Sequence, residues 1–229
     1  MDTKLPPGQQ ARADFPRFGL DQFARRFPPE TARIEIRCSG AVASEVLLAD
    51  ALQNLPRVEQ ISDFHCVTTW SKRGLRWGGV RFADFYDQVI VPRAQPQPEA
   101  AYVILRGQDG ARTSMLLADL LAPDVLLADT LDGAPLPLAH GAPVRLVAPA
   151  HYGYKSVKHL SRLEFRRDDR GFRASGLRFM QHPRARVAWE ERGRWFPGWF
   201  LRYLYRPLIG GTVKRFARAL DEYEQNRRG

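Results

Sequence analysis

Cys66 is one of only two cysteines in the chain, and it stands in the run SDFHCVTTWS, residues 62–71. The run RVEQISDFHCV, residues 57–67, predicts a strand that delivers Cys66 at its end, where a polar loop follows. A sulfur in that position is placed to face a cleft, and a thiolate is a soft donor that suits a heavy or soft metal. A cofactor would have to supply the remaining donors, because no second protein ligand is apparent. The alternative interpretation is a cysteine packed in the core.

A second segment with functional side chains, HGAPVRLVAPAHYGYKSVKHL, spans 140–160 and combines Arg145, Lys155 and Lys158 with glycines and Ser156. Glycine lets the backbone approach a ligand closely. Arginine offers a planar fork to a phosphate or to a heterocycle edge, and lysine offers a point charge. Backbone N–H groups in a tight turn can also hold an anion. The alternative is a strand, a turn and solvated lysines.

Common cofactor and catalytic motifs are absent from the sequence. There is no Gly-x-Gly-x-x-Gly opening a helix and no P-loop. No CxxC or HExxH motif offers a zinc site, and no Gly-x-Ser-x-Gly elbow offers a nucleophile. Carboxylates are scattered, so no pair stands out as general acid and base.

The composition is that of an ordinary globular protein, with 229 residues, 44% hydrophobic and 26% charged. No apolar run reaches the roughly 18 residues that a transmembrane helix needs. The N-terminal stretch lacks the apolar region of a secretory signal, so we expect a cytoplasmic protein. A disulfide between Cys38 and Cys66 is not expected in that reducing compartment, and Cys38 is interpreted as a small buried side chain.

The net charge of +10 is concentrated toward the C-terminal end. Residues 166–229 hold 16 Lys and Arg against 7 Asp and Glu, whereas residues 1–165 hold 19 against 18. Aromatic residues and arginines are interleaved over 195–211, and an apolar stripe at helical spacing starts at Val213. We expect this segment to pack on the body or on a second subunit. Contact with a membrane surface or with an acidic electron-transfer partner is the alternative, and nucleic-acid binding is the less favoured one.

The mixture of strand and helix patterns, without a regular βαβ rhythm, favours the α+β class. Further strands are expected over 32–42, 101–107 and 141–150. Helices are expected over 44–56 and, after a turn at Gly78–Gly79, up to residue 90. A hairpin is expected around Asp132–Gly133. The predicted parts are an N-terminal arm at 1–30, a central domain at 31–166 and a basic aromatic extension at 167–229.

In this order and spacing, the two functional segments resemble the molybdopterin-binding oxidoreductase domain of the sulfite oxidase family. The resemblance runs from about Arg33 to Phe165. Its markers are CVTTWS, WGGVRFADF and the block LLADTLDGAPLPLAHGAPVRLVAPAHYGYKSVKHLSRLEF. That family includes sulfite oxidases, plant nitrate reductases and bacterial protein-methionine-sulfoxide reductases. The resemblance implies a sulfite-oxidase-type molybdopterin-binding domain of mixed strands and helices, with Mo-molybdopterin as cofactor.

The resemblance also implies roles for individual residues. Cys66 matches the cysteine whose thiolate ligates molybdenum beside two sulfurs of the pyranopterin dithiolene. Cofactor contacts are implied at Asp109, His140 and Arg145 and, in the phosphate-binding turn, at Ser156, Val157 and Lys158. The family often carries Arg-Asn-His in its N-terminal arm, and here Arg25 or Arg26 would take that place.

The implied activity is that of an oxidoreductase that passes an oxygen atom and two electrons to or from a small substrate of the sulfite, sulfoxide or N-oxide type. A separate electron-transfer partner would be needed, because no CxxCH haem site is present. His65 and His151 adjoin the two segments and are expected to be structural, with proton delivery as the alternative. The dimerisation domain of true sulfite oxidases does not fit into 166–229. A pterin-binding protein without turnover is an alternative function.

Overall fold

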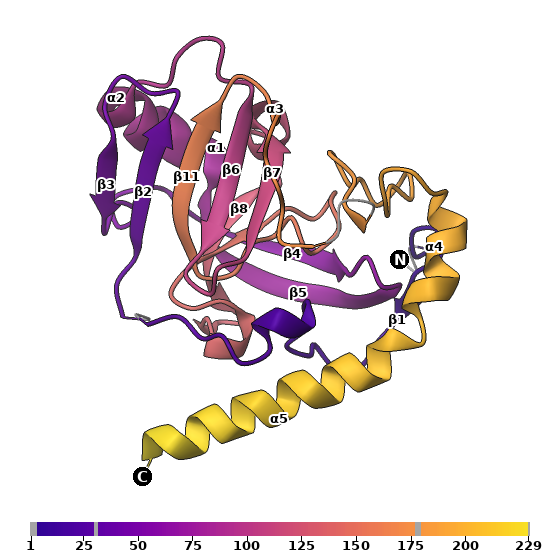
Figure 1. The fold of residues 1–229 in the computed structure, drawn as a ribbon. Helices are drawn as coiled ribbons and strands as arrows, with labels where there is room; N and C mark the ends of the chain where they lie inside the picture. The colour runs from indigo at the N-terminus through magenta and orange to yellow at the C-terminus, as the bar shows by residue number, and fades with distance from the viewer. Residues whose placement is uncertain (1–3, 30–31, 177–179, 229) are drawn as a thin grey trace.

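The computed structural model describes residues 4–29, 32–176 and 180–228. Two β-sheets make up the body, and two helices, α4 (Gly198–Tyr205) and α5 (Leu208–Arg228), run along its periphery (Figure 1). The α+β class expected from the sequence is confirmed.

The first sheet has six strands and carries the cysteine loop. Its path runs β1–β5–β8–β10, with β4 paired to β5 and β9 paired to β8. The strands are β1 (Gln10–Ala11), β4 (Arg57–His65), β5 (Trp70–Arg81), β8 (Leu126–Leu131), β9 (Ala134–Pro135) and β10 (Arg145–Val147). β4 and β5 form an antiparallel hairpin in which His65 lies opposite Ser71, so Cys66 starts the connecting loop. Pairing of β8 with β9 confirms the hairpin expected at Asp132–Gly133.

The second sheet has five strands in the order β3–β2–β11–β6–β7. They are β2 (Glu35–Gly40), β3 (Val46–Ala49), β6 (Tyr102–Gly107), β7 (Arg112–Leu116) and β11 (Leu160–Arg166). The central strand β11 runs parallel to β2 and antiparallel to β6. It therefore anchors the loop that precedes it, residues 153–158, to the middle of this sheet.

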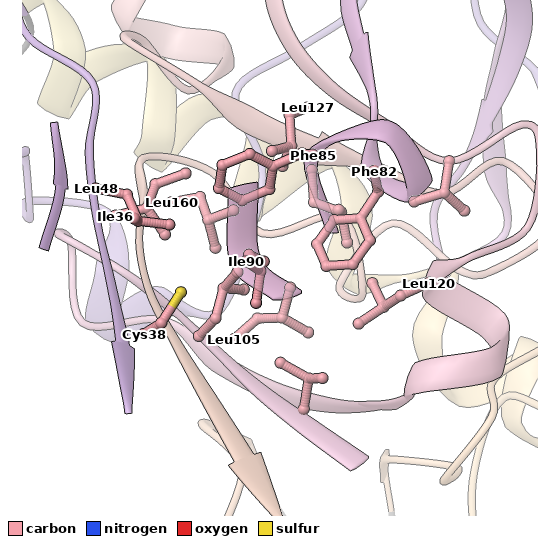
Figure 2. Packing of buried hydrophobic residues seen from close by; sticks show 14 of the residues in the cluster. Ile36, Cys38, Leu48, Phe82, Phe85, Ile90, Leu105, Leu120, Leu127 and Leu160 are labelled. Carbon is pink, nitrogen blue, oxygen red and sulfur yellow. The ribbon is translucent and has the colours of Figure 1, made fainter. Parts of the chain in front are cut away.

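The main hydrophobic core joins the two sheets to the helical segment after β5 (Figure 2). That segment consists of α1 (Phe82–Phe85), η2 (Tyr86–Ile90) and α2 (Val91–Ala94), and the remaining short helices are η1 (Asp21–Phe23), α3 (Leu117–Leu120) and η3 (Leu138–His140). Phe82, Phe85 and Ile90 are completely buried in the core. Cys38 is also fully enclosed, and burial raises its pKa to about 12. The expectation that Cys38 is a packed core thiol is confirmed.

The helix expected over 44–56 is wrong, because these residues form β3 and a turn. β3 pairs with β2, and Leu48 lies opposite Ile36 with its side chain completely buried. The neighbouring Leu47 is 45% exposed, which is the alternation of a strand. Asp50 then adopts a left-handed φ of 52° that ends the strand. Pairing with β2 outweighs the helical spacing of the apolar residues, as tertiary context often does.

The turn expected at Gly78–Gly79 is also wrong, because both glycines lie inside β5. A Cβ at Gly79 would lie 2.1 Å from the carbonyl oxygen of Leu127, and one at Gly78 would lie 2.2 Å from Oγ1 of Thr130. Both contacts are with β8, so glycine here permits close approach of neighbouring strands rather than a reversal. The expected helical segment does follow, but it starts only at Phe82.

The C-terminal extension forms two helices. They are α4 (Gly198–Tyr205) and α5 (Leu208–Arg228). α5 packs Phe216 and Ala219 against Phe23 and Ala24 of the N-terminal arm, so the expected packing on the body is confirmed. Across the described residues, no helix combines the length and apolar character needed to cross a bilayer.

Candidate functional site

A cavity of about 150 Å³ lies where three loops meet beside the first sheet. Its wall is built from the arm at 15–20, the cysteine loop at 66–68 and the turn at 153–158, together with His140 and Arg145. Strands β4 and β5 hold the cysteine loop, and β10 begins at Arg145. The two segments that the sequence singled out for chemistry therefore face one cavity.

Hydrogen bonds fix the cysteine loop on both sides. The amide of Cys66 donates to the carbonyl of Trp70 at 2.8 Å, and the amide of Thr69 donates back to the carbonyl of Cys66 at 3.1 Å. Nε2 of Gln9 donates to the same carbonyl at 3.1 Å. The sulfur of Cys66 is on the cavity wall, 3.1 Å from Oγ1 of Thr68. The loop thus holds one sulfur in a defined position.

The protein alone favours the thiol form of Cys66. Burial raises the pKa of this thiol, and the hydrogen bond with Thr68 and the charges of Arg192 and Lys158 only partly oppose the shift. A bound metal cation would displace the proton, because the thiolate is the ligand form. Among the described residues no group of three or more His, Cys, Asp and Glu could hold a metal. A metal on Cys66 would therefore take its other ligands from a cofactor.

Two cationic side chains border the cavity without a carboxylate, the buried Arg145 and the partly buried Lys158. Arg145 donates from Nη1 to the carbonyl of His140 at 2.9 Å and from Nη2 to that of Ser156 at 3.0 Å. Burial lowers the pKa of Arg145 to about 9. Burial, and then the charges of Arg145 and Arg17, lower the pKa of Lys158 to about 7. No salt bridge involves Arg145 or Lys158 in the described ranges. Buried charge of one sign is costly, so this wall is suited to an anion.

His140 presents a flat neutral ring to the cavity. Its imidazole stacks on Phe15 with centroids 4.3 Å apart and an interplanar angle of 7°. Burial, and then the nearby charges of Arg145 and Lys158, lower the pKa of His140 to about 3. A neutral imidazole can hydrogen-bond a heterocycle without adding charge.

Aromatic residues form much of the remaining wall. Phe15, Phe18, Phe64 and Trp70 line the cavity, and the indole Nε1 of Trp70 is buried without a hydrogen-bond partner. Gly153 permits this packing, since a Cβ there would lie 2.1 Å from the ring of Phe64. Flat apolar walls, an unpaired donor, two cations and a thiol together fit a planar pterin that carries a phosphate and a thiolate-bound metal.

The predicted phosphate turn reaches the cavity with only some of its residues. Ser156 lines the wall, and its Oγ accepts the amide of Ala148 at 3.1 Å. Val157 lies in the main hydrophobic core instead, so its side chain supports the turn from behind. Asp109 is buried off the cavity wall, where its Oδ1 accepts the amide of Ala111 at 3.0 Å. Its negative charge reaches the cavity only indirectly, by opposing the pKa shift of Lys158.

Lys155 points away from the cavity and serves the structure. Its ammonium is almost completely buried and donates to the carbonyls of Ser114 at 2.6 Å and Pro183 at 2.7 Å. Burial lowers its pKa from 10.5 to about 7. The sequence grouped Lys155 with Lys158, but these two residues, three positions apart in the same turn, face different sides.

This buried lysine makes stability depend on pH. Between pH 7 and 10.5 the unfolded chain keeps a proton that the folded chain has released. The free energy of unfolding should therefore rise with pH in this window, by up to about 1.4 kcal/mol per pH unit. Urea denaturation of wild type and Lys155→Met at a series of pH values should show this slope difference. The exposed Lys214→Met variant should follow wild type, and parallel curves for Lys155→Met would contradict the prediction.

The two histidines next to the functional segments are structural. Nδ1 of His65 hydrogen-bonds Oγ of Ser71 at 2.8 Å, and Nδ1 of His151 donates to the carbonyl of Arg184 at 2.6 Å. Neither is on the cavity wall.

The arginines expected to act from the arm lie elsewhere. Arg25 is exposed and pairs with Glu222 at 3.0 Å. Arg26 is exposed too, and its guanidinium lies over the ring of Phe23. The expectation that Arg25 or Arg26 takes the place of the family's Arg-Asn-His element at the site is therefore not supported by this structure.

Arg17 is the buried arginine of the arm, and sequence reasoning missed it. It donates to the carbonyls of Ala24, Phe23 and Arg26 at 2.6, 3.1 and 2.9 Å, which folds the arm over the cavity. Burial lowers its pKa to about 10, and Asp109 opposes the shift. The only feature of the sequence that could have indicated its burial is its position between Phe15 and Phe18 of the arm.

Arg192, from the C-terminal extension, is a second missed residue. It is completely buried and donates from Nη1 to the carbonyl of Val67 at 2.6 Å and from Nη2 to that of Pro7 at 3.0 Å. Its Nε pairs with Glu190 at 3.1 Å. Arg192 thus braces the residue that follows Cys66, across 125 positions of sequence. No local pattern distinguishes it from the other arginines of the basic segment.

Comparison with known proteins shows the family to which the chain is similar. A family model described as "Oxidoreductase molybdopterin binding domain" matches residues 16–172. The chain is 34% identical to "Uncharacterized oxidoreductase YuiH" of Bacillus subtilis over 167 residues, which are 72% of this chain and 81% of that protein. It is 30% identical to "Putative protein-methionine-sulfoxide reductase subunit YedZ1" of Azospira oryzae over 171 residues, 74% of this chain and 57% of the relative.

A third relative and a solved structure extend the comparison. "Protein-methionine-sulfoxide reductase catalytic subunit MsrP" of Ralstonia nicotianae is 27% identical over 172 residues, 66% of this chain and 50% of that protein. The chain thus spans only about half of the two sulfoxide-reductase relatives. The sulfane dehydrogenase SoxCD of Paracoccus pantotrophus superposes with a TM-score of 0.51 at 21% identity, over 58% of this chain and 38% of that one, which shows a shared fold.

Proposed function

Because the chain belongs to the family of oxidoreductase molybdopterin-binding domains, we propose that its cavity holds Mo-molybdopterin with the metal on Sγ of Cys66. Family membership makes the chain an oxidoreductase with a Mo-molybdopterin cofactor. One observation supports the assignment of the site above all. A buried thiol, the buried guanidinium of Arg145 and the partly buried ammonium of Lys158 face the same cavity, and neither cation has a carboxylate partner.

Each wall of the cavity has a distinct role in this proposal. Arg145 and Lys158, with the turn at Ser156, hold the phosphate and the polar edge of the pterin. His140 hydrogen-bonds the ring system as a neutral imidazole. The aromatic wall excludes water, which strengthens these electrostatic contacts. When bound, the cofactor supplies two-electron chemistry coupled to transfer of an oxygen atom, and the protein supplies position and electrostatics.

The proposed reaction is oxygen-atom transfer to or from a small substrate of the sulfite, sulfoxide or N-oxide type. Two relatives are named for protein-methionine-sulfoxide reductase, and this supports a sulfoxide as the first substrate to examine. A separate partner would supply the two electrons for reduction of a sulfoxide or N-oxide, or accept the two electrons released by oxidation of sulfite. The proposed domain boundaries are an arm at 1–30, the cofactor domain at 31–166 and the extension at 167–229. Cytoplasmic location is part of the proposal.

The rival functions differ in what they would bind and convert. A pterin-binding protein without turnover would contain the cofactor but would not oxidise or reduce dyes. A nucleic-acid module acting through the extension would bind DNA or RNA with strong salt dependence. It would leave the enclosed thiol and cations without a role.

The test is metal analysis by mass spectrometry on protein purified from a host that makes molybdopterin. The same sample is oxidised and assayed for the fluorescent pterin derivative. Molybdenum and pterin in equal amounts, near one of each per chain, are expected, together with reduction of sulfoxides by a dye donor. Folded protein from such a host that contains neither would overturn the proposal, and cofactor without turnover on any substrate class would favour the carrier.

A further inference from the structure

Helix α4 and the first residue of α5 carry large apolar side chains that are exposed to solvent. Trp199, Phe200, Tyr203, Leu204 and Leu208 are 58, 40, 63, 51 and 53% exposed. We call these five residues the aromatic ridge. They fall outside the matched domain, which ends at residue 172. Contiguous exposed apolar surface of this kind marks an interaction site on a folded protein.

The opposite side of α4 fixes the orientation of the ridge. Leu201 and Tyr205 are 0 and 3% exposed, one helical turn apart. Arg202 donates from Nε and Nη2 to the carboxylate of Glu190 at 2.9 and 2.6 Å. Glu190 also binds Arg192, the residue that braces the cysteine loop. The ridge is therefore the outer face of a helix whose inner face is already packed.

The surroundings of the ridge carry positive charge. Residues 184–218 contain nine Lys and Arg but only two carboxylates. Both carboxylates are engaged inside the segment, Glu190 with Arg192 and Arg202, and Glu191 with Arg186. An anionic surface is complementary to this positively charged segment. Its two carboxylates, Glu190 and Glu191, already pair with arginines of the same segment.

We propose that the aromatic ridge docks the protein on an anionic phospholipid membrane. Tryptophan and tyrosine favour the interface between lipid and water, where the ring is apolar and its polar atom stays wet. A helix with an apolar aromatic face and basic flanks lies in the plane of such a surface. α4 stands at the periphery of the molecule, beside the short edge strand β1, so its outer face is open to a flat surface (Figure 1). The cavity would then lie near the membrane, because Arg192 links α4 to the cysteine loop.

The test is sedimentation of the purified full chain with phosphatidylcholine vesicles and with vesicles of phosphatidylcholine and phosphatidylserine. Binding should be strong only to the anionic vesicles and should weaken as salt is added. The double variant Trp199→Ser, Tyr203→Ser should bind at least about tenfold more weakly, because two rings no longer leave water. Both positions are exposed, so its melting temperature should match wild type. Ile61→Ser, which removes an apolar side chain 72% exposed on β4, is the matched control and should bind as wild type does.

Other outcomes overturn the proposal. Absence of binding to anionic vesicles excludes it, and so does equal binding of wild type and the double variant. A second copy of the chain is the rival occupant. If light scattering shows a wild-type dimer that the double variant converts to monomer, and vesicles do not compete with it, the ridge is a subunit interface. These results do not depend on turnover, so they stand apart from the test of the proposed function.

Discussion

Replacement of Cys66 by serine should leave the protein folded and reduce its turnover by at least about 100-fold. Mutation of a residue that hydrogen-bonds a metal ligand typically lowers metal affinity or activity by about 10- to 100-fold. Removal of the ligand itself should lower activity by at least the larger of these factors. The structure offers no substitute, since no cluster of His, Cys, Asp and Glu lies among its described residues. The fold should survive because the Cys66 side chain packs against a cavity and its one hydrogen bond, to Thr68, can be made by a hydroxyl.

Cys38→Ser is the matched control for this experiment. Cys38 is completely enclosed in the main core, away from the cavity. A hydroxyl there would be buried among apolar neighbours at a cost of about 1–3 kcal/mol, so this variant should melt earlier. It should nevertheless retain molybdenum and turnover per folded molecule. The two substitutions thus separate stability from metal ligation.

X-ray absorption at the molybdenum edge gives a readout besides activity. Cys66→Ser protein that still contains pterin should lose one sulfur neighbour of the metal, and Cys38→Ser should lose none. Full turnover in Cys66→Ser, or an unchanged sulfur shell, would show that the metal is not held by this residue. The cofactor could then still occupy the cavity, but with another orientation.

The parts of the site that could be predicted from sequence are those with a local signal. The residues at 57–67 predicted a strand leading to Cys66, and β4 ends at His65. The spacing of His140, Arg145 and Lys158 matched a known family, and the structure gathers all three around one cavity. The predicted secondary structure and the resemblance to the family lead to the same site residues. This agreement arises because the site residues lie at or near the ends of strands and short helices.

Other parts depend on contacts between residues far apart in the chain. Arg192 reaches the cysteine loop from the C-terminal extension, and Arg17 is buried only because the arm folds across the cavity. Neither has a neighbour in sequence that reveals its burial. The sequence around Gly78 and Gly79 also gives no sign of the distant strand that these glycines contact, so the pair suggested a turn. Its real function, close approach to β8, becomes visible only when the sheet is assembled.

Phe216 in α5 connects the extension to the cavity, and its removal should open the site. The side chain is 1% exposed. Its ring lies 5.0 Å from the guanidinium of Arg17, stacks on Phe18 with centroids 6.5 Å apart, and would be 3.3 Å from a Cβ at Gly19. Phe18 and Gly19 line the cavity, so α5 presses the arm onto the site from outside.

Phe216→Ala should therefore lower the free energy of unfolding by about 3 kcal/mol, because the lost ring leaves a void under the arm. Local opening of the arm should precede global unfolding. Hydrogen exchange should accelerate at arm amides such as Phe23 and Ala24, and much less in β6 and β11. The loaded variant should also release pterin faster on dilution, since the arm forms part of the cavity wall.

Phe200→Ala makes the matched comparison, because it truncates an exposed phenylalanine of the same extension. It should leave stability, exchange of the arm and pterin release close to wild type. If Phe216→Ala instead accelerated exchange equally in the arm and in β6 and β11, the helix would stabilise the whole fold and not the arm. If exchange accelerated in the arm while pterin release stayed at the wild-type rate, the arm would not retain the cofactor. The expected pattern, a local opening with faster release, would make α5 the element that closes the cofactor site.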